Sequence, residues 1–193
     1  MLLIMFFIVA CAPVKTLDVW KDQTYDRPLQ KVLVIAVAQN DIIRNQFENV
    51  LALQLAKKGV EAIASHKVLP QAPTQLDRET VVAKVKALGI DHVLVARSIK
   101  KTEITNHQLG GPFFAPTAMY NDGWYTYYAG SVIYPEREYD TDYFTLATNL
   151  FAVGHNKPIW TFLSQVKVEG SRQGAVNEFI PVLVKHLEES QLI

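Results

Sequence analysis

Apolar residues in the first half of the chain form short continuous runs that alternate with helical patterns. The run Lys31–Ala38 is rich in β-branched residues and predicts a strand buried on both faces. From Asn40 to Lys58 the apolar positions recur every three or four residues, which predicts an amphipathic helix that Gly59 ends. Val60–Ala64 predicts a second strand.

The same alternation is then repeated. Leu76–Leu88 has helical spacing and ends at Gly89, and His92–Ala96 predicts a third strand that continues toward Thr105. Strands joined by helices through short, right-handed connections lie parallel in one sheet. The first half therefore predicts a βαβαβ unit.

The second half has a different pattern. Tyr143–Val153 and Ile159–Val168 are typical of two strands of an antiparallel hairpin. Ser171 is placed to cap a final helix. Pro181 lies within this helix and can either kink it or make it begin later. We therefore expect an α/β fold with α+β character in its second half. In this fold a mixed sheet combines the βαβαβ unit with antiparallel hairpin strands and a C-terminal helix.

The first residues suggest a leader rather than part of this domain. Leu2–Ala10 is apolar and uncharged, and as a helix it would rise about 14 Å, whereas a bilayer core is about 30 Å thick. Its length is typical of the apolar part of a signal peptide. The four residues Ile8-Val9-Ala10-Cys11 resemble the bacterial lipobox, in which a cysteine follows a small residue.

That resemblance implies cleavage between Ala10 and Cys11 and acylation of Cys11, so that the lipid bilayer becomes a partner of the chain. Ala12, rather than an aspartate, follows the cysteine, which favours the periplasmic face of the outer membrane over the inner membrane. No basic residue precedes the apolar run, which departs from the usual signal peptide. We expect a signal peptide at 1–10, a lipidated tether at 11–30 and one α/β domain at 31–193.

Charge and cysteine content narrow the function. The chain has 19 basic and 19 acidic residues and no basic stripe, which argues against nucleic acid as a partner. Cys11 is the only cysteine, so no disulfide can form within the chain. Gly110-Gly111 lacks the strand, lysine and helix of a phosphate loop, and the five histidines have no metal-ligand spacing. We expect no cofactor and no metal.

Seven of the eight tyrosines fall between Tyr120 and Tyr143. Tyrosine and tryptophan are rigid and amphipathic, which suits contact surfaces. One interpretation is a surface for an envelope protein partner; the other is a loop that covers one face of the sheet. The candidate partner-binding residues are Tyr120, Trp124, Tyr125, Tyr127 and Tyr128.

We expect a non-enzymatic binding or assembly-accessory module, and two alternatives stay open. One is a small hydrolase that uses Asp140, Asp142 or His107, although no serine or cysteine is placed with a base. The other is a glycan-binding or small-ligand-binding protein, which an exposed Trp124 beside a groove would favour. The oligomeric state is left open.

A family resemblance points the same way. The run KVLVIAVA, followed by Arg44-x-x-Phe47-Glu48 and Leu55-x-x-x-Gly59, resembles a group of uncharacterised bacterial lipoproteins, as does the later segment from Ala147 to Trp160. The order of elements is also similar to the amino-terminal domain of TolB. The resemblance implies a compartment and a fold, but it implies no reaction.

Overall fold

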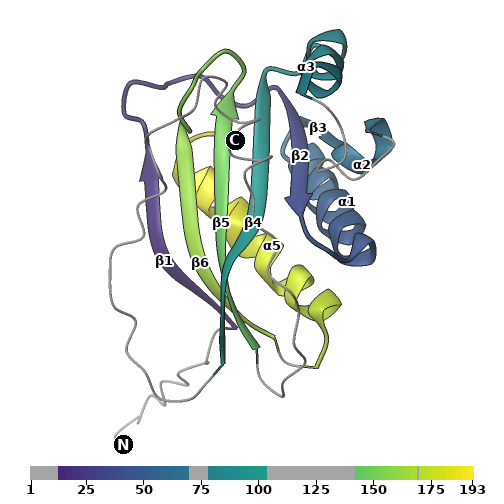
Figure 1. Cartoon of the computed structure of the whole chain (residues 1–193). Helices are drawn as coiled ribbons and strands as arrows, with labels where there is room; N and C mark the ends of the chain where they lie inside the picture. The colour runs from purple at the N-terminus through teal and green to yellow at the C-terminus, as the bar shows by residue number, and fades with distance from the viewer. Residues whose placement is uncertain (1–12, 70–77, 104–141, 169) are drawn as a thin grey trace, which may run out of the picture.

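The computed structural model describes residues 13–69, 78–103, 142–168 and 170–193. Within these residues six strands form one mixed sheet in the order β1-β6-β5-β4-β2-β3 (Figure 1). The strands are β1 (Val14–Lys21), β2 (Lys31–Val37), β3 (Glu61–Ala64), β4 (His92–Glu103), β5 (Asp142–Ala152) and β6 (Trp160–Val168). The helices are α1 (Asp41–Lys57), α2 (Ser65–Val68), α3 (Arg78–Ala87) and α5 (Arg172–Glu189).

The expected fold class is confirmed. β2 pairs in parallel with β3 and β4, as the βαβαβ pattern predicts, while β5 pairs antiparallel with both β4 and β6. The predicted ends of α1 are also observed: Asn40 caps it through bonds from the backbone N–H groups of Ile42 and Ile43, and Gly59 follows with a φ of 85°. Ser171 caps α5, which begins at Arg172, so Pro181 does not delay it.

One expected segment is wrong. We expected residues 11–30 to be a tether, but Val14–Lys21 is β1, the edge strand next to β6. Its pairing is antiparallel and shifts register between Thr16 and Asp18, so Leu17 lies in a bulge. The folded domain therefore starts before residue 31.

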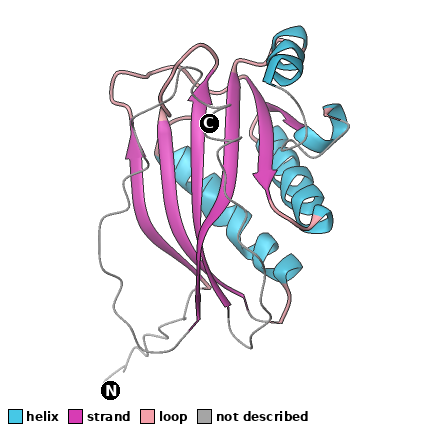
Figure 2. Cartoon of the chain, viewed as in Figure 1, coloured by secondary structure: helices cyan, strands magenta, loops and turns pink. Residues whose placement is uncertain are grey.

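The sheet separates two apolar cores. Alternate side chains of the central strands point to opposite faces, so Val32 and Val34 meet α1 and α5 while Leu33 and Ile35 meet α3. Figure 2 shows α1 and α5 together on one side of the sheet. On the opposite face α3 belongs to a smaller core with side chains of β2, β4 and β5, among them Leu33, Val93 and Phe151.

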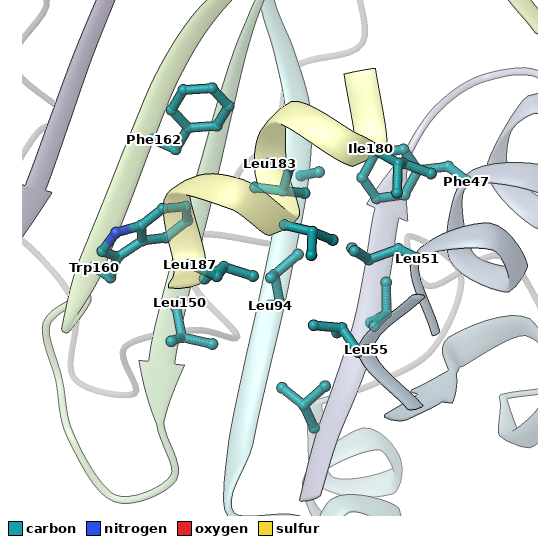
Figure 3. Close-up of a cluster of buried hydrophobic side chains, with 14 of the residues drawn as sticks. Phe47, Leu51, Leu55, Leu94, Leu150, Trp160, Phe162, Ile180, Leu183 and Leu187 are labelled. Carbon is teal, nitrogen blue, oxygen red and sulfur yellow. The ribbon is translucent and has the colours of Figure 1, made fainter. Parts of the chain in front are cut away.

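The larger core lies between α1, α5 and the sheet. Figure 3 shows Phe47, Leu51 and Leu55 of α1 facing α5, with Trp160 and Phe162 of β6 on the other side of α5. The indole of Trp160 is fully buried, and its N–H donates to the Ser190 hydroxyl over 2.9 Å. Because burial of apolar side chains favours folding, this larger core should contribute more to stability than the described core around α3.

Candidate functional site

Most of the residues that the sequence singled out lie outside the described part of the chain. The set comprises Ala10, Cys11, His107, Tyr120, Trp124, Tyr125, Tyr127, Tyr128 and Asp140. Asp142 is the first residue of β5, and its backbone pairs with Glu103 and Val168. The hydrolase and glycan hypotheses therefore stay untested predictions. Residues 104–141 contain most of the tyrosines and are called the tyrosine-rich segment below. The two residues that border this segment, Glu103 and Asp142, are paired in the sheet.

A polar cluster that the sequence did not predict lies at the carboxyl ends of β2 and β3. Its centre is Glu48 of α1, which is fully buried. Oε1 accepts hydrogen bonds from the Ala36 N–H over 3.0 Å and the Ser65 hydroxyl over 2.6 Å. Oε2 accepts from the backbone N–H of His66 over 2.9 Å and from its ring Nδ1 over 2.7 Å. One carboxylate thus joins α1, β2 and α2.

Arg44 is the cation of this cluster and is only 5% exposed. Its Nε lies 3.3 Å from Glu48 Oε1, and its Nη1 lies 3.7 Å from Asp41 Oδ1. Arg44 Nη2 has no hydrogen-bond partner among the described residues. Buried ion pairs lose hydration that their attraction only partly restores, so this pair is sensitive to the loss of either member.

The cluster has one feature of a catalytic site and lacks another. A carboxylate that holds His66 through Nδ1 orients the ring, as in catalytic dyads. The adjacent Ser65 hydroxyl, however, donates to Glu48 rather than to His66. The Ser65 hydroxyl therefore has a structural role, and the Glu48 cluster connects α1, β2 and α2 through hydrogen bonds.

A second cluster of polar side chains lies where β2 and β4 begin, at the end of these strands opposite to the Glu48 cluster. The Tyr25 hydroxyl is 2.5 Å from Nε2 of the buried His92, whose Nδ1 is 3.0 Å from an oxygen of Asp91. That same oxygen accepts the backbone N–H of Lys31. Burial raises the pKa of Tyr25 above its usual value, although the positive charge of Arg27 opposes the effect. Tyr25 therefore stays protonated and ties the segment after β1 to the sheet.

The third notable region is where β1 enters the sheet. The Pro13 carbonyl accepts a 2.8 Å hydrogen bond from the Lys167 N–H, and the Val14 side chain is buried in the α5 core. The chain is thus held in the sheet from two residues after Cys11. Figure 1 shows that β1 and β5 start and β4 and β6 end together, at the end of the sheet where α5 begins.

Other ligand chemistry has no candidate among the described residues. They contain no group of three or more histidine, cysteine or acidic side chains that could hold a metal ion. None of the helices assigned in this part of the chain is both long and apolar enough to cross a bilayer.

Comparisons with known proteins give only distant structural neighbours. No protein-family model matches the chain, and no curated protein matches it. The PelC dodecamer of Paraburkholderia phytofirmans has a TM-score of 0.48 at 8% identity, over 90% of this chain and 95% of that chain. Lipoprotein GNA1162 of Neisseria meningitidis has a TM-score of 0.42 at 12% identity, over 83% of this chain and 99% of that chain. At these scores the likenesses carry no argument about function.

Proposed function

We propose that this protein is a lipid-anchored module of the bacterial cell envelope that acts by binding rather than by catalysis. The observation that carries the proposal is the lipobox-like Ile8-Val9-Ala10-Cys11, placed immediately before a strand that is built into the sheet. An acyl group on Cys11 would hold the folded domain itself, with almost no intervening linker. With Ala12 after the cysteine, the proposed location is the periplasmic face of the outer membrane.

The internal polar groups support binding over catalysis. Both oxygens of Glu48 accept bonds from donors within the protein, and the hydroxyl that could serve as a nucleophile is one of those donors. Catalysis needs a nucleophile that its base can reach. The hydrogen-bonding groups of this cluster instead connect α1, β2 and α2.

The anchor is tested by metabolic labelling with radioactive palmitate in a Gram-negative host. We expect label in the native chain and none in Cys11→Ala, since the acyl groups have no other thiol in the chain. One acyl chain binds membranes only marginally and several bind stably, so Cys11→Ala should also leave the membrane fraction. Equal labelling of both proteins would contradict the proposal.

The binding role is tested on the tyrosine-rich segment. Crosslinking pull-downs from native membranes should recover envelope partners with the native chain and lose them with the combined substitutions Tyr125→Ser, Tyr127→Ser and Tyr128→Ser. Trp20→Ser, which changes an exposed aromatic side chain on β1, is the matched control. Circular dichroism checks the fold, and a variant that unfolds would favour the interpretation of this segment as a cover for the sheet.

A further inference from the structure

The chain between Cys11 and the sheet is too short to let the domain move away from its anchor. Consecutive Cα atoms are 3.8 Å apart, so Cys11 and Pro13 are separated by at most about 8 Å. The Pro13 carbonyl is already bonded to β6. The sheet is much longer than this, because β5 has 11 residues and a strand rises about 3.3 Å per residue, or about 36 Å in all.

We infer that one end of the sheet lies directly on the phospholipid headgroups. This anchor end is formed by the start of β1, the end of β4, the start of β5, the end of β6 and the start of α5 (Figure 1). The inference depends on the proposed acylation of Cys11. It goes further than that proposal in two respects: it identifies the surface of the domain that faces the bilayer, and it says that this surface contacts phospholipid headgroups.

The residues at the anchor end suit an anionic headgroup layer. Three charged residues at this end have side chains that the structure describes, Lys15, Lys167 and Arg172, and all three are basic. Lys15 is exposed at the start of β1. The guanidinium of Arg172 lies 5.8 Å from the centre of the Phe144 ring. Basic groups next to aromatic surface are typical of membrane interfaces.

The orientation also limits where a partner can bind. The backbones of Glu103 and Asp142 pair at the anchor end, which is the bilayer side in this orientation. The turn at residues 154–158, between β5 and β6, is at the far end, about 36 Å from the headgroups when the strands stand upright.

The orientation is tested by fluorescence quenching in vesicles. The lipidated mature protein, which starts at Cys11, would carry a single new thiol, Lys15→Cys at the anchor end or Lys157→Cys at the far turn, labelled with an environment-sensitive dye. Both lysines are exposed, and acylation blocks Cys11. With phosphatidylethanolamine–phosphatidylglycerol vesicles that contain a headgroup nitroxide lipid, we expect strong quenching at position 15 and almost none at 157.

The outcomes separate the two proposals. Protein that fails to float with the vesicles contradicts acylation itself. Protein that floats, but with equal quenching or none at both positions, overturns the orientation alone.

The contribution of charge is tested on residues 12–193, which lack both the apolar run and the thiol, so that weak binding to the vesicles depends on charge. Lys15→Glu with Arg172→Glu should weaken binding to the phosphatidylglycerol vesicles at least about 30-fold, the equivalent of about 1 kcal/mol for each of the two basic residues near the surface. Lys157→Glu with Lys185→Glu is the matched control and should have little effect. Equal loss in both pairs would overturn a specific anchor end.

Discussion

At the scale of single residues, Glu48 is the side chain on which most polar contacts converge. Glu48→Gln replaces an acceptor of four hydrogen bonds by an amide and leaves the buried Arg44 without its nearest anion. We expect a loss of about 3–5 kcal/mol in the free energy of unfolding, measured by urea denaturation. Glu188→Gln removes an exposed ion pair with Lys58 and should cost about 1 kcal/mol or less. Similar losses of unfolding free energy for both variants would contradict the role of Glu48 in connecting these elements.

Tyr25 gives a pH-dependent prediction. Burial raises its pKa in the folded state, so above about pH 10 the unfolded chain loses this proton first and stability falls as the pH rises. Tyr25→Phe removes this contribution, and at neutral pH it costs about 1 kcal/mol for the lost hydrogen bond. The stability gap between the two proteins should therefore be constant up to about pH 10 and narrow above it. A constant gap in urea titrations would contradict the prediction.

At the scale of elements, α5 contains an exposed proline within its span. Pro181 has no N–H for the helical bond, and proline inside a helix costs up to about 3 kcal/mol relative to alanine. Pro181→Ala should raise the free energy of unfolding by about 1–3 kcal/mol. Lys185→Ala, another exposed position on the same helix, should change it by about 0.5 kcal/mol or less. A destabilised Pro181→Ala protein would show that the local backbone depends on the proline.

The elements also show why some of the structure was predictable and some was not. The central strands β2 and β4 bury both faces, so continuous apolar runs reveal them. In β1 only Val14 is buried, and the bulge at Leu17 breaks the alternation, so the sequence carries little strand signal. The four residues of α2 are too few for any helical period.

The Glu48 cluster did leave a signal. Arg44 and Glu48 precede Leu51 and Leu55 at spacings of four, three and four, so all four lie on one face of α1, and that face is buried. What the spacing cannot show is the donors of β2 and α2, which reach Glu48 only through the tertiary fold.

At the scale of the whole molecule, the two cores share their strands. Leu33 faces the α3 side, whereas Trp160 reports on the α5 side. Leu33→Ala should cost about 3 kcal/mol. Because one sheet carries both cores, the unfolding midpoint from Trp160 fluorescence should shift together with that from circular dichroism. The measurement uses a Trp20→Phe, Trp124→Phe background, and separate midpoints would mean that the two sides unfold independently.

The pairing of the first strand with the last has a consequence for the order of folding. Val14 pairs with Val166, 152 positions later, so this contact closes almost the whole chain as one loop. Closing such a loop costs roughly 4 kcal/mol in chain entropy, which is recovered only when the later strands are present. β2 to β5 can therefore assemble before β1 pairs with β6. If the amino terminus is already fixed in the bilayer, β6 must return to it, and the sheet is completed at the membrane surface.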